Sequence, residues 1–325
     1  MTTLNIASKP SSLACAKPLA ARRRQAGVSV VELLVAMAVG GLVIVAAVGV
    51  TISSQRLFGT DQARTNINQN LRSALDLIGD DVRVAGQRLV GSGLSPIRIF
   101  VDDDGNHNLE IRRSMVPAVL PLCNTSNEPI RAGNAANLTV GMPNGTGNCN
   151  ADDNRPLLAM WEDYRINNGG CVMAYIVQPG QPGEFFSYRG ESPQANGAIN
   201  LNHTRGSGSS CAHANNGSWQ NDYTKDARMH ILEMRRYVLN TETNTLELII
   251  NEDVANPLRL VNDITDFEVS AILNDDTSTN DFEAPFNWGR LAAVEVNITG
   301  EGQAGQNVIT RSLSSRFFPR NILSN

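Results

Sequence analysis

A single carboxylate, Glu32, stands inside an apolar run at residues 28–50 that follows three arginines and a glycine. An acid in a membrane span costs several kcal/mol or forces its side chain to reach for water, so it marks a functional position by default. A buried carboxylate is tolerated where a cation neutralises it. The chemistry open to Glu32 is therefore pairing with a positive group.

The apolar run is long enough to hold this acid within a membrane. Its 23 residues would extend roughly 35 Å as a helix, against a hydrocarbon core of about 30 Å. The arginines at 22–24 should stay cytoplasmic, which places the rest of the chain across the membrane. Three alternatives fit less well. A cleaved secretory signal has a shorter core and an A-x-A exit, a twin-arginine signal lacks so long a core, and a plain signal anchor does not readily accept Glu32.

The stretch AGVSVVELLVA at residues 26–36 resembles the class III signal of type IV pilins and pseudopilins. The resemblance implies that a prepilin peptidase cuts after Gly27 and that Val28 becomes the N-methylated first residue. Val28 stands where the family usually has phenylalanine. This difference affects the expectation of methylation more than the expectation of cleavage. The resemblance also implies that Glu32 pairs with the α-amino group of a neighbouring subunit and fixes the register of packed helices.

A second helical pattern follows the apolar run. Charged and amide residues, Asp81 among them, lie between its apolar positions. The spacing predicts an amphipathic helix over residues 51–92 with one apolar face on a domain, ended by GSGLSP at 91–96. The apolar positions are Ile67, Leu71, Leu75, Ile78, Val82, Ala85 and Leu89.

From residue 97 onward the pattern becomes that of β-strands. Runs at 97–101 and 109–113 flank a D-G turn, which we favour over a calcium loop because the EF-hand pattern is incomplete. Further strands are expected at 156–163, 171–178, 184–189, 229–240, 246–250, 260–273, 291–300 and 309–318. Residues 120–155 and 190–222, rich in Asn, Gly, Ser and Pro, should be long surface loops. A long helix followed by antiparallel strands predicts an α+β, pilin-like fold with a β-rich domain at 93–325.

Cysteine spacing predicts cross-links in this domain. Four of the five cysteines lie in it, widely spaced and without a C-x-x-C pair, which indicates two disulfides if the compartment is oxidising. Four buried free thiols are the alternative. Among three possible pairings we favour Cys123–Cys149 and Cys171–Cys211, because these close the loop-rich segments locally.

The remaining residues show no pattern of an active site. There is no G-x-S-x-G or H-E-x-x-H motif, and RGSGSS at 205–210 lacks the lysine of a phosphate loop. We therefore expect no enzyme activity, no metal site and no cofactor. After residue 27 the chain has 22 basic and 32 acidic residues, a formal charge of −10, which disfavours nucleic acid as a partner.

The C-terminal strands resemble those of a narrower group within this family. Between RRYVLN at 235–240 and RSLSSRFFPRN at 311–321 the chain is similar to PilW-type minor pilins, so that with the N-terminal motif about half of the chain is covered. The resemblance implies a leader at 1–27, an inner-membrane anchor and a periplasmic domain. It implies a minor pilin that primes type IV pilus assembly with other minor pilins and the major pilin, supporting twitching motility or adhesion.

Two other classes of function stay open on the sequence. A minor pseudopilin of a type II secretion machine, of the J class, has a similar layout but is usually shorter. A membrane-anchored periplasmic enzyme or receptor should show a polar catalytic cluster, which the sequence does not display. Size and the C-terminal strands favour the minor pilin.

Overall fold

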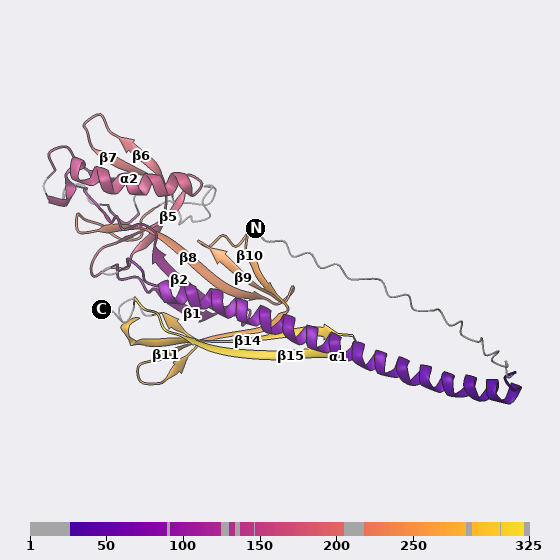
Figure 1. The fold of residues 1–325 in the computed structure, drawn as a ribbon. Helices are drawn as coiled ribbons and strands as arrows, with labels where there is room; N and C mark the ends of the chain where they lie inside the picture. Colours follow the sequence, from indigo (N-terminus) through magenta and orange to yellow (C-terminus); the bar gives the residue numbers. More distant parts are fainter. Residues whose placement is uncertain are drawn as a thin grey trace, which may run out of the picture. The chain divides into compact units, whose positions relative to one another are not determined.

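The computed structural model describes residues 27–89, 92–124, 130–133, 137–145, 147–204, 218–283, 288–305 and 307–321 (Figure 1). The chain divides into two compact units, residues 1–55 and 56–325, and each is described by itself. The predicted α+β fold is confirmed. A long N-terminal helix, α1 (Val30–Val84), precedes antiparallel sheets.

In the second unit α1 carries the predicted apolar face. All seven predicted positions are buried, five of them in α1 and two, Ala85 and Leu89, in the turn that follows it. The helix ends at Val84, earlier than the predicted residue 92. Gly86 is the reason, because it takes a positive φ of 75° and its N–H donates to the Arg112 carbonyl at 2.9 Å instead of into the helix. An L side chain is strained in that conformation, so glycine sets the end of α1.

A four-stranded sheet packs on one side of α1. Its strand order is β12–β11–β14–β15, and the neighbouring strands are antiparallel. The strands are β11 (Ile264–Leu273), β12 (Ser278–Thr279), β14 (Leu291–Ala304) and β15 (Asn307–Phe317). The sheet and the helix approach closely at Gly79, where an added Cβ would lie 2.5 Å from the Phe317 ring.

A larger sheet completes the unit. Its strands near α1 are β1 (Ile97–Val101), β2 (His107–Ser114), β8 (Arg228–Asn240), β9 (Thr245–Ile250), β10 (Leu258–Asn262) and β13 (Phe282–Glu283). Its remaining strands are β3 (Leu120–Pro121), β4 (Leu138–Gly141), β5 (Val172–Val177), β6 (Glu184–Pro193) and β7 (Ile199–Thr204). The predicted hairpin around residues 102–108 joins β1 to β2, with the Asp102 carboxylate accepting the Asn106 N–H at 2.8 Å.

The first core lies between α1 and the two sheets. It is mainly aliphatic, and its members come from regular elements at periodic positions. Representative side chains are Leu71 and Ile78 of α1, Leu109 and Ile111 of β2, and Val294, Val296 and Ile298 of β14.

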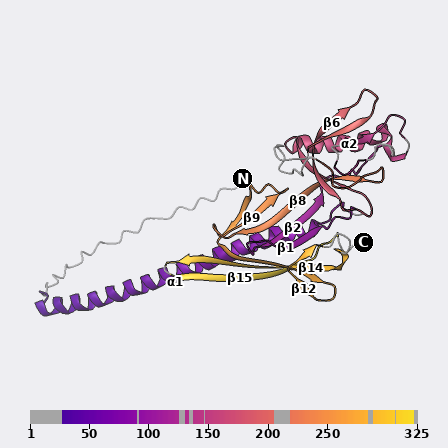
Figure 2. The same ribbon diagram turned by 180° about the vertical axis from the view of Figure 1, so that it is seen from behind.

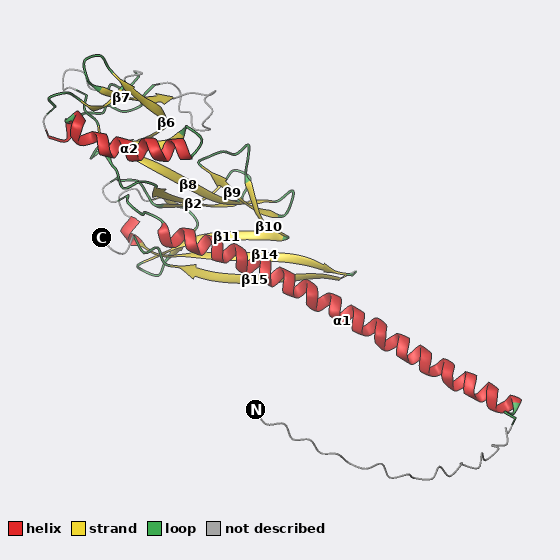
Figure 3. Ribbon diagram, turned by 45° about the horizontal axis from the view of Figure 1, so that its top comes forward, coloured by secondary structure: helices red, strands yellow, loops and turns green. Residues whose placement is uncertain are grey.

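A second core lies in what we call the second lobe, the described part of residues 115–227. Here α2 (Ala151–Asn167) packs beside β3, β4 and β6, and Figure 3 shows it next to β6. This core is rich in aromatic rings, namely Trp161, Phe186, Tyr188, Trp219 and Tyr223. Strand β8 belongs to both cores, since Met229 and Ile231 enter the second and Tyr237 and Leu239 enter the first.

The strand predicted at residues 156–163 is wrong, because this stretch lies in α2. Asn150 caps the helix by accepting the Asp152 N–H at 2.9 Å, and two acids follow in the first turn. The buried residues Asn154, Leu158 and Trp161 are spaced by four and three, which is a helical period.

The two predicted loops are also more structured than expected. Residues 120–155 contain β3, β4, the 3-10 turn η1 (Gly147–Cys149) and the start of α2, and residues 190–222 contain the end of β6 and β7. Leu122, Ile130 and Leu138 are buried in the first of these segments. Isolated apolar residues thus supply core contacts within an Asn- and Gly-rich composition.

The strand predicted at 260–273 is split. Asp263, with a positive φ of 64°, separates β10 of the larger sheet from β11 of the four-stranded sheet. Its carbonyl accepts the Glu301 N–H of β14 at 2.9 Å. The other expected strands correspond to β5, β6, β8, β9, β14 and β15 and are confirmed.

Candidate functional site

The residues predicted for processing lie directly before α1. Ser29 starts the helix, because its carbonyl accepts the Leu33 N–H at 3.1 Å and its hydroxyl accepts the Val31 N–H at 3.4 Å. Gly27 and Val28 lie outside the helix, and Val28 is 67% exposed. A Cβ added to Gly27 would meet no atom within 4 Å. The Gly27–Val28 bond is therefore exposed, in backbone that is not held in a helix.

Glu32 lies in the first turn of α1 and is exposed. A carboxylate at this end of a helix is favoured by the unpaired N–H groups of the first turn. Glu32 forms no ion pair with any residue that the structure describes. Within this chain its negative charge has no side-chain partner among the described residues.

Within the first unit, residues 33–50 of α1 present an apolar surface on every side of the helix. Residues 28–55 are all exposed apart from half-buried Gly40. Among the described residues, α1 is the one helix long and apolar enough to cross a membrane, with a mean hydropathy of 2.7 over its most apolar window. A helix that is hydrophobic all round requires apolar surroundings, as in a membrane or between packed helices.

The model of the prokaryotic N-terminal methylation motif matches residues 22–48. The chain carries a prepilin-type N-terminus. This match supports a type IV pilin-like or pseudopilin protein, and the apolar helix with this motif fits a single-pass, membrane-anchored pilin. Comparison with curated proteins and with solved structures gives no match. The match covers Gly27, Val28 and Glu32, the three residues predicted for processing and register.

Three of the five cysteines, Cys123, Cys149 and Cys171, lie in the second lobe. Cys123 and Cys149 form a disulfide with a Cα–Cα distance of 5.4 Å, as predicted, and join the segment after β3 to η1. Cys171 is disulfide-bonded. Cys211, its predicted partner, lies outside the described residues, so the Cys171–Cys211 pairing stays a prediction.

Sequence analysis missed a buried ionic cluster that holds α1 to β8. Asp81, only 5% exposed, accepts hydrogen bonds from Arg235 Nη1 at 2.6 Å and from the Tyr237 hydroxyl at 2.5 Å. Burial and the Asp81 carboxylate raise the pKa of Tyr237. Glu233 extends the cluster by pairing with Arg235 at 3.0 Å and with Arg113 at 2.8 Å. Asp81 follows Ile78 by three positions, and this spacing places it on the apolar face.

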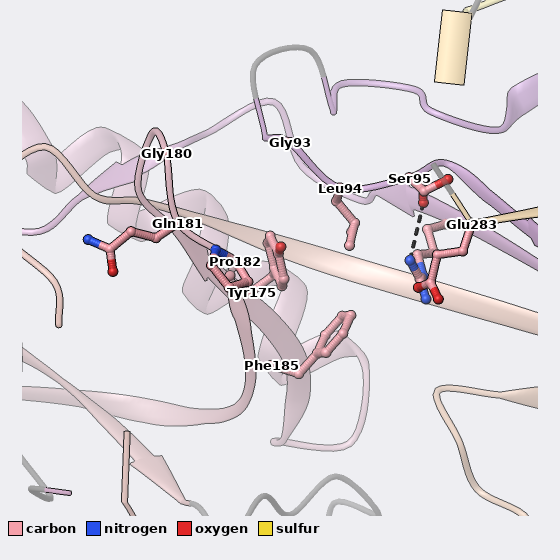
Figure 4. A pocket seen from close by; sticks show the side chains of 11 residues that line it. Gly93, Leu94, Ser95, Tyr175, Gly180, Gln181, Pro182, Phe185 and Glu283 are labelled. Carbon is pink, nitrogen blue, oxygen red and sulfur yellow. Dashed lines mark hydrogen bonds between the residues drawn. The ribbon is translucent and has the colours of Figure 1, made fainter. Parts of the chain in front are cut away.

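A cavity of about 360 Å³ lies among residues 93–95, Arg112 of β2, and the hairpin of β5 and β6 (Figure 4). Leu94, Tyr175 and Phe185 supply its apolar wall. Its buried cation, Arg112, pairs with Glu110 and donates to the Ser95 carbonyl at 3.3 Å. Among the described residues no group of His, Cys, Asp or Glu is placed to hold a metal ion. The other charged residue of the lining, Glu283, pairs with Arg98 at 3.1 Å, so both charged lining residues have partners outside the cavity.

Proposed function

We propose that this chain is a minor pilin that helps prime assembly of a type IV pilus. The observation that carries the proposal is a prepilin motif at residues 22–48 on a helix that is apolar on every side and holds one acid in its first turn. The role is structural, and we assign the chain no reaction and no cofactor. Its proposed location is the inner membrane, with a periplasmic domain, and then the pilus.

The proposed mechanism begins with removal of the leader. A prepilin peptidase cuts the exposed bond between Gly27 and Val28 and frees the α-amino group of Val28, which is then methylated. In the assembly the Glu32 carboxylate of one subunit pairs with the α-amino group of its neighbour. A buried charge without a partner costs far more than a paired one, so only one axial register satisfies both groups.

The second unit supplies partner choice in this proposal. All pilin-like anchors have similar apolar surfaces, so helix packing alone gives little discrimination between partners. The surfaces available in the second unit are the exposed face of α1 and the strands beside it, because the buried face of α1 is already occupied by the first core. The proposed partners are other minor pilins and the major pilin.

The decisive experiment compares Gly27→Ala with wild type. The mutant should accumulate with its leader and should not enter pili, and N-terminal sequencing of wild type should start at Val28. Gly41→Ala is the matched control, since it too is an exposed glycine with no atom within 4 Å of an added Cβ. A wild-type chain that keeps residues 1–27 would overturn the proposal.

A second measurement distinguishes a role in pilus assembly from a role in type II secretion. Glu32→Ala should be cut normally but enter pili at least tenfold less, the loss of about 1.4 kcal/mol of pairing free energy. Deletion of the gene should lower pilus number and twitching. Normal pili with failed exoprotein secretion would instead identify a minor pseudopilin of a type II secretion machine.

A further inference from the structure

Strand β15 is the last strand of the four-stranded sheet, and its outer edge faces away from β14. All eleven of its residues pair with β14, from Asn307 opposite Ala304 to Phe317 opposite Val294, without a shift in register. Figures 1, 2 and 3 all draw β15 beside β14, and β11 lies on the other side of β14. Val308, Thr310, Ser312 and Ser314 are exposed along this strand.

The other edges of the described sheets are short or irregular. Strands β12 and β13 have two residues each, and β4 and β10 each contain a register shift against their neighbours. Short strands and bulges are the usual means by which proteins prevent pairing at an edge. Edge strand β15 has neither feature, and its unbroken length makes it the best template for another strand.

The direction of the backbone groups of β15 follows from how β14 bonds to the segment before β11. The Glu301 N–H of β14 donates to the Asp263 carbonyl on that side, so the Glu301 backbone is not bonded to the backbone of Thr310, its partner in β15. The two residues interact through their side chains, since the Thr310 hydroxyl donates to the Glu301 carboxylate at 3.3 Å. In an antiparallel pair of strands, two opposite residues either exchange both backbone hydrogen bonds or exchange neither. Glu301 and Thr310 exchange neither, so the N–H and C=O of Thr310 point away from β14, toward the outer edge of the sheet. Because the register is unbroken, the same holds for every second residue, which are Val308, Thr310, Ser312, Ser314 and Arg316.

We propose that this edge accepts an extended strand of a different subunit that carries an acidic side chain opposite Arg311. Five backbone donors and five acceptors would pair with it, as in recognition by strand addition. The inference rests on the proposed role in an assembly of several pilin-like chains. It adds that the contact is made through main-chain hydrogen bonds at β15.

The charges on β15 favour a different subunit, and not a second copy of this chain, as the source of the added strand. Arg316 is paired with Glu295 at 2.7 Å, whereas Arg311 is exposed and forms no ion pair with a described residue. Strand β15 contains no Asp or Glu, so a second β15 would leave Arg311 unpaired in every register. Antiparallel pairing of two copies would also close on itself as a two-fold dimer and could not extend an assembly.

The test places a photo-crosslinking amino acid at Val308 of the full chain in cells that form pili. The control position is Val254, a valine on the turn after β9, with 64% exposure against 59% for Val308. We expect a crosslink from position 308, and not from 254, to another protein with a prepilin-type N-terminus. A crosslink to a second copy, or none from the processed chain in pilus fractions, would overturn the inference.

A backbone variant makes the test specific to strand pairing. Ser314→Pro removes one outward N–H without breaking the bonds to β14, because proline is accepted at an edge strand whose N–H faces solvent. Ser314→Ala keeps that N–H and is the matched control. Proline should lower the crosslink at least fivefold and alanine less than twofold, with unchanged thermal unfolding. Equal yields from the two variants would contradict pairing through the main chain.

Charge reversal and processing complete the design. Arg311→Glu should also lower the crosslink at least fivefold, and a yield equal to wild type would exclude an acidic partner side chain. The leader is assayed in the same cells. A processed chain in pili without the crosslink refutes the edge contact alone, whereas an uncut leader refutes the proposed function and the edge contact with it.

Discussion

The first core and the second lobe are stabilised in different ways. The first core is made of aliphatic side chains at regular intervals along α1 and long strands. The second lobe has a disulfide and a cluster of buried rings, including the T-shaped pair Trp161 and Tyr188. Its chain is also held by single polar residues, as where Glu184 accepts the backbone N–H groups of Gln220 and Asn221. Periodic burial stabilises one region, and a few large contacts stabilise the other.

The largest expected effect is that of Trp161→Ala. Trp161 is fully buried, and its indole N–H donates to the Ala118 carbonyl at 2.8 Å. Removing the ring should lower the free energy of unfolding of the second lobe by about 4 kcal/mol. Hydrogen exchange on the full chain in detergent should show the loss in α2 and β5–β7, while β14 and β15 keep their protection.

Met160→Ala is the control for this substitution, because Met160 is the preceding residue of α2 and is 44% exposed. It should cost less than about 1 kcal/mol, as surface changes usually do. Equal loss of protection in β14 would mean that the two cores unfold as one unit, and the contrast between them would then fail.

The disulfide should matter only to the second lobe. Replacing both Cys123 and Cys149 by serine opens a loop with a sequence separation of 26 residues. The loop-entropy estimate for a cross-link of this span is about 3.5 kcal/mol. Urea unfolding followed by second-lobe tryptophan fluorescence should shift accordingly. If hydrogen exchange of the β14 amides became faster by an equal free energy, the disulfide would be stabilising the whole unit.

The same contrast explains which parts of the fold could be predicted from the sequence. The buried stripe of α1, the β1–β2 hairpin and the long strands followed from periodicity, because one side chain in three or four, or in two, meets a continuous core. In the second lobe Leu122, Ile130 and Leu138 are single buried residues among polar neighbours, and no period marks them. Trp161 had a helical period that the strand prediction overlooked.

The candidate site was predictable in part for a related reason. The motif at Gly27, Val28 and Glu32 is local in sequence, so composition and spacing are sufficient to find it. The pairing of Asp81 with Arg235 joins residues 154 positions apart, and only the fold brings them together. The split at Asp263 is equally non-local, because its carbonyl is bound by a strand that comes later in the chain.

A smaller effect is expected at the ionic cluster of the first core. Asp81→Ala leaves Arg235 and the Tyr237 hydroxyl without their acceptor and should cost about 2 kcal/mol, less than a fully buried pair because the Arg235 side chain is 27% exposed. Asp80→Ala is the matched control. Its carboxylate is 77% exposed and, among the described residues, pairs with Arg83 alone, in the same helix, so the cost should stay below about 0.5 kcal/mol. Equal costs in chemical unfolding would remove the cluster from the account of the first core.

The smallest expected effect concerns His230, which lies on β8, the strand that the two cores share. His230 is 4% exposed, stands opposite Tyr175 of β5, and its Nδ1 has no hydrogen-bond partner among the described residues. Burial lowers its pKa from 6.5 to about 4. Below pH 6.5 the unfolded chain binds a proton that the folded chain does not, so stability is complete above pH 6.5 and falls as the pH drops toward 4. One proton gives a slope of at most about 1.4 kcal/mol per pH unit.

The matched variant is His230→Gln, which keeps a polar side chain but does not titrate in this range. Chemical unfolding of the full chain at pH 7 and pH 5 should show wild type losing about 1–2 kcal/mol more than the variant over this interval. Other groups titrate equally in both proteins, so the difference between them isolates His230. Because β8 is shared, exchange should reveal this loss in both cores. A loss confined to one core would show that β8 does not couple them, and identical pH profiles would mean that His230 is not held neutral by burial.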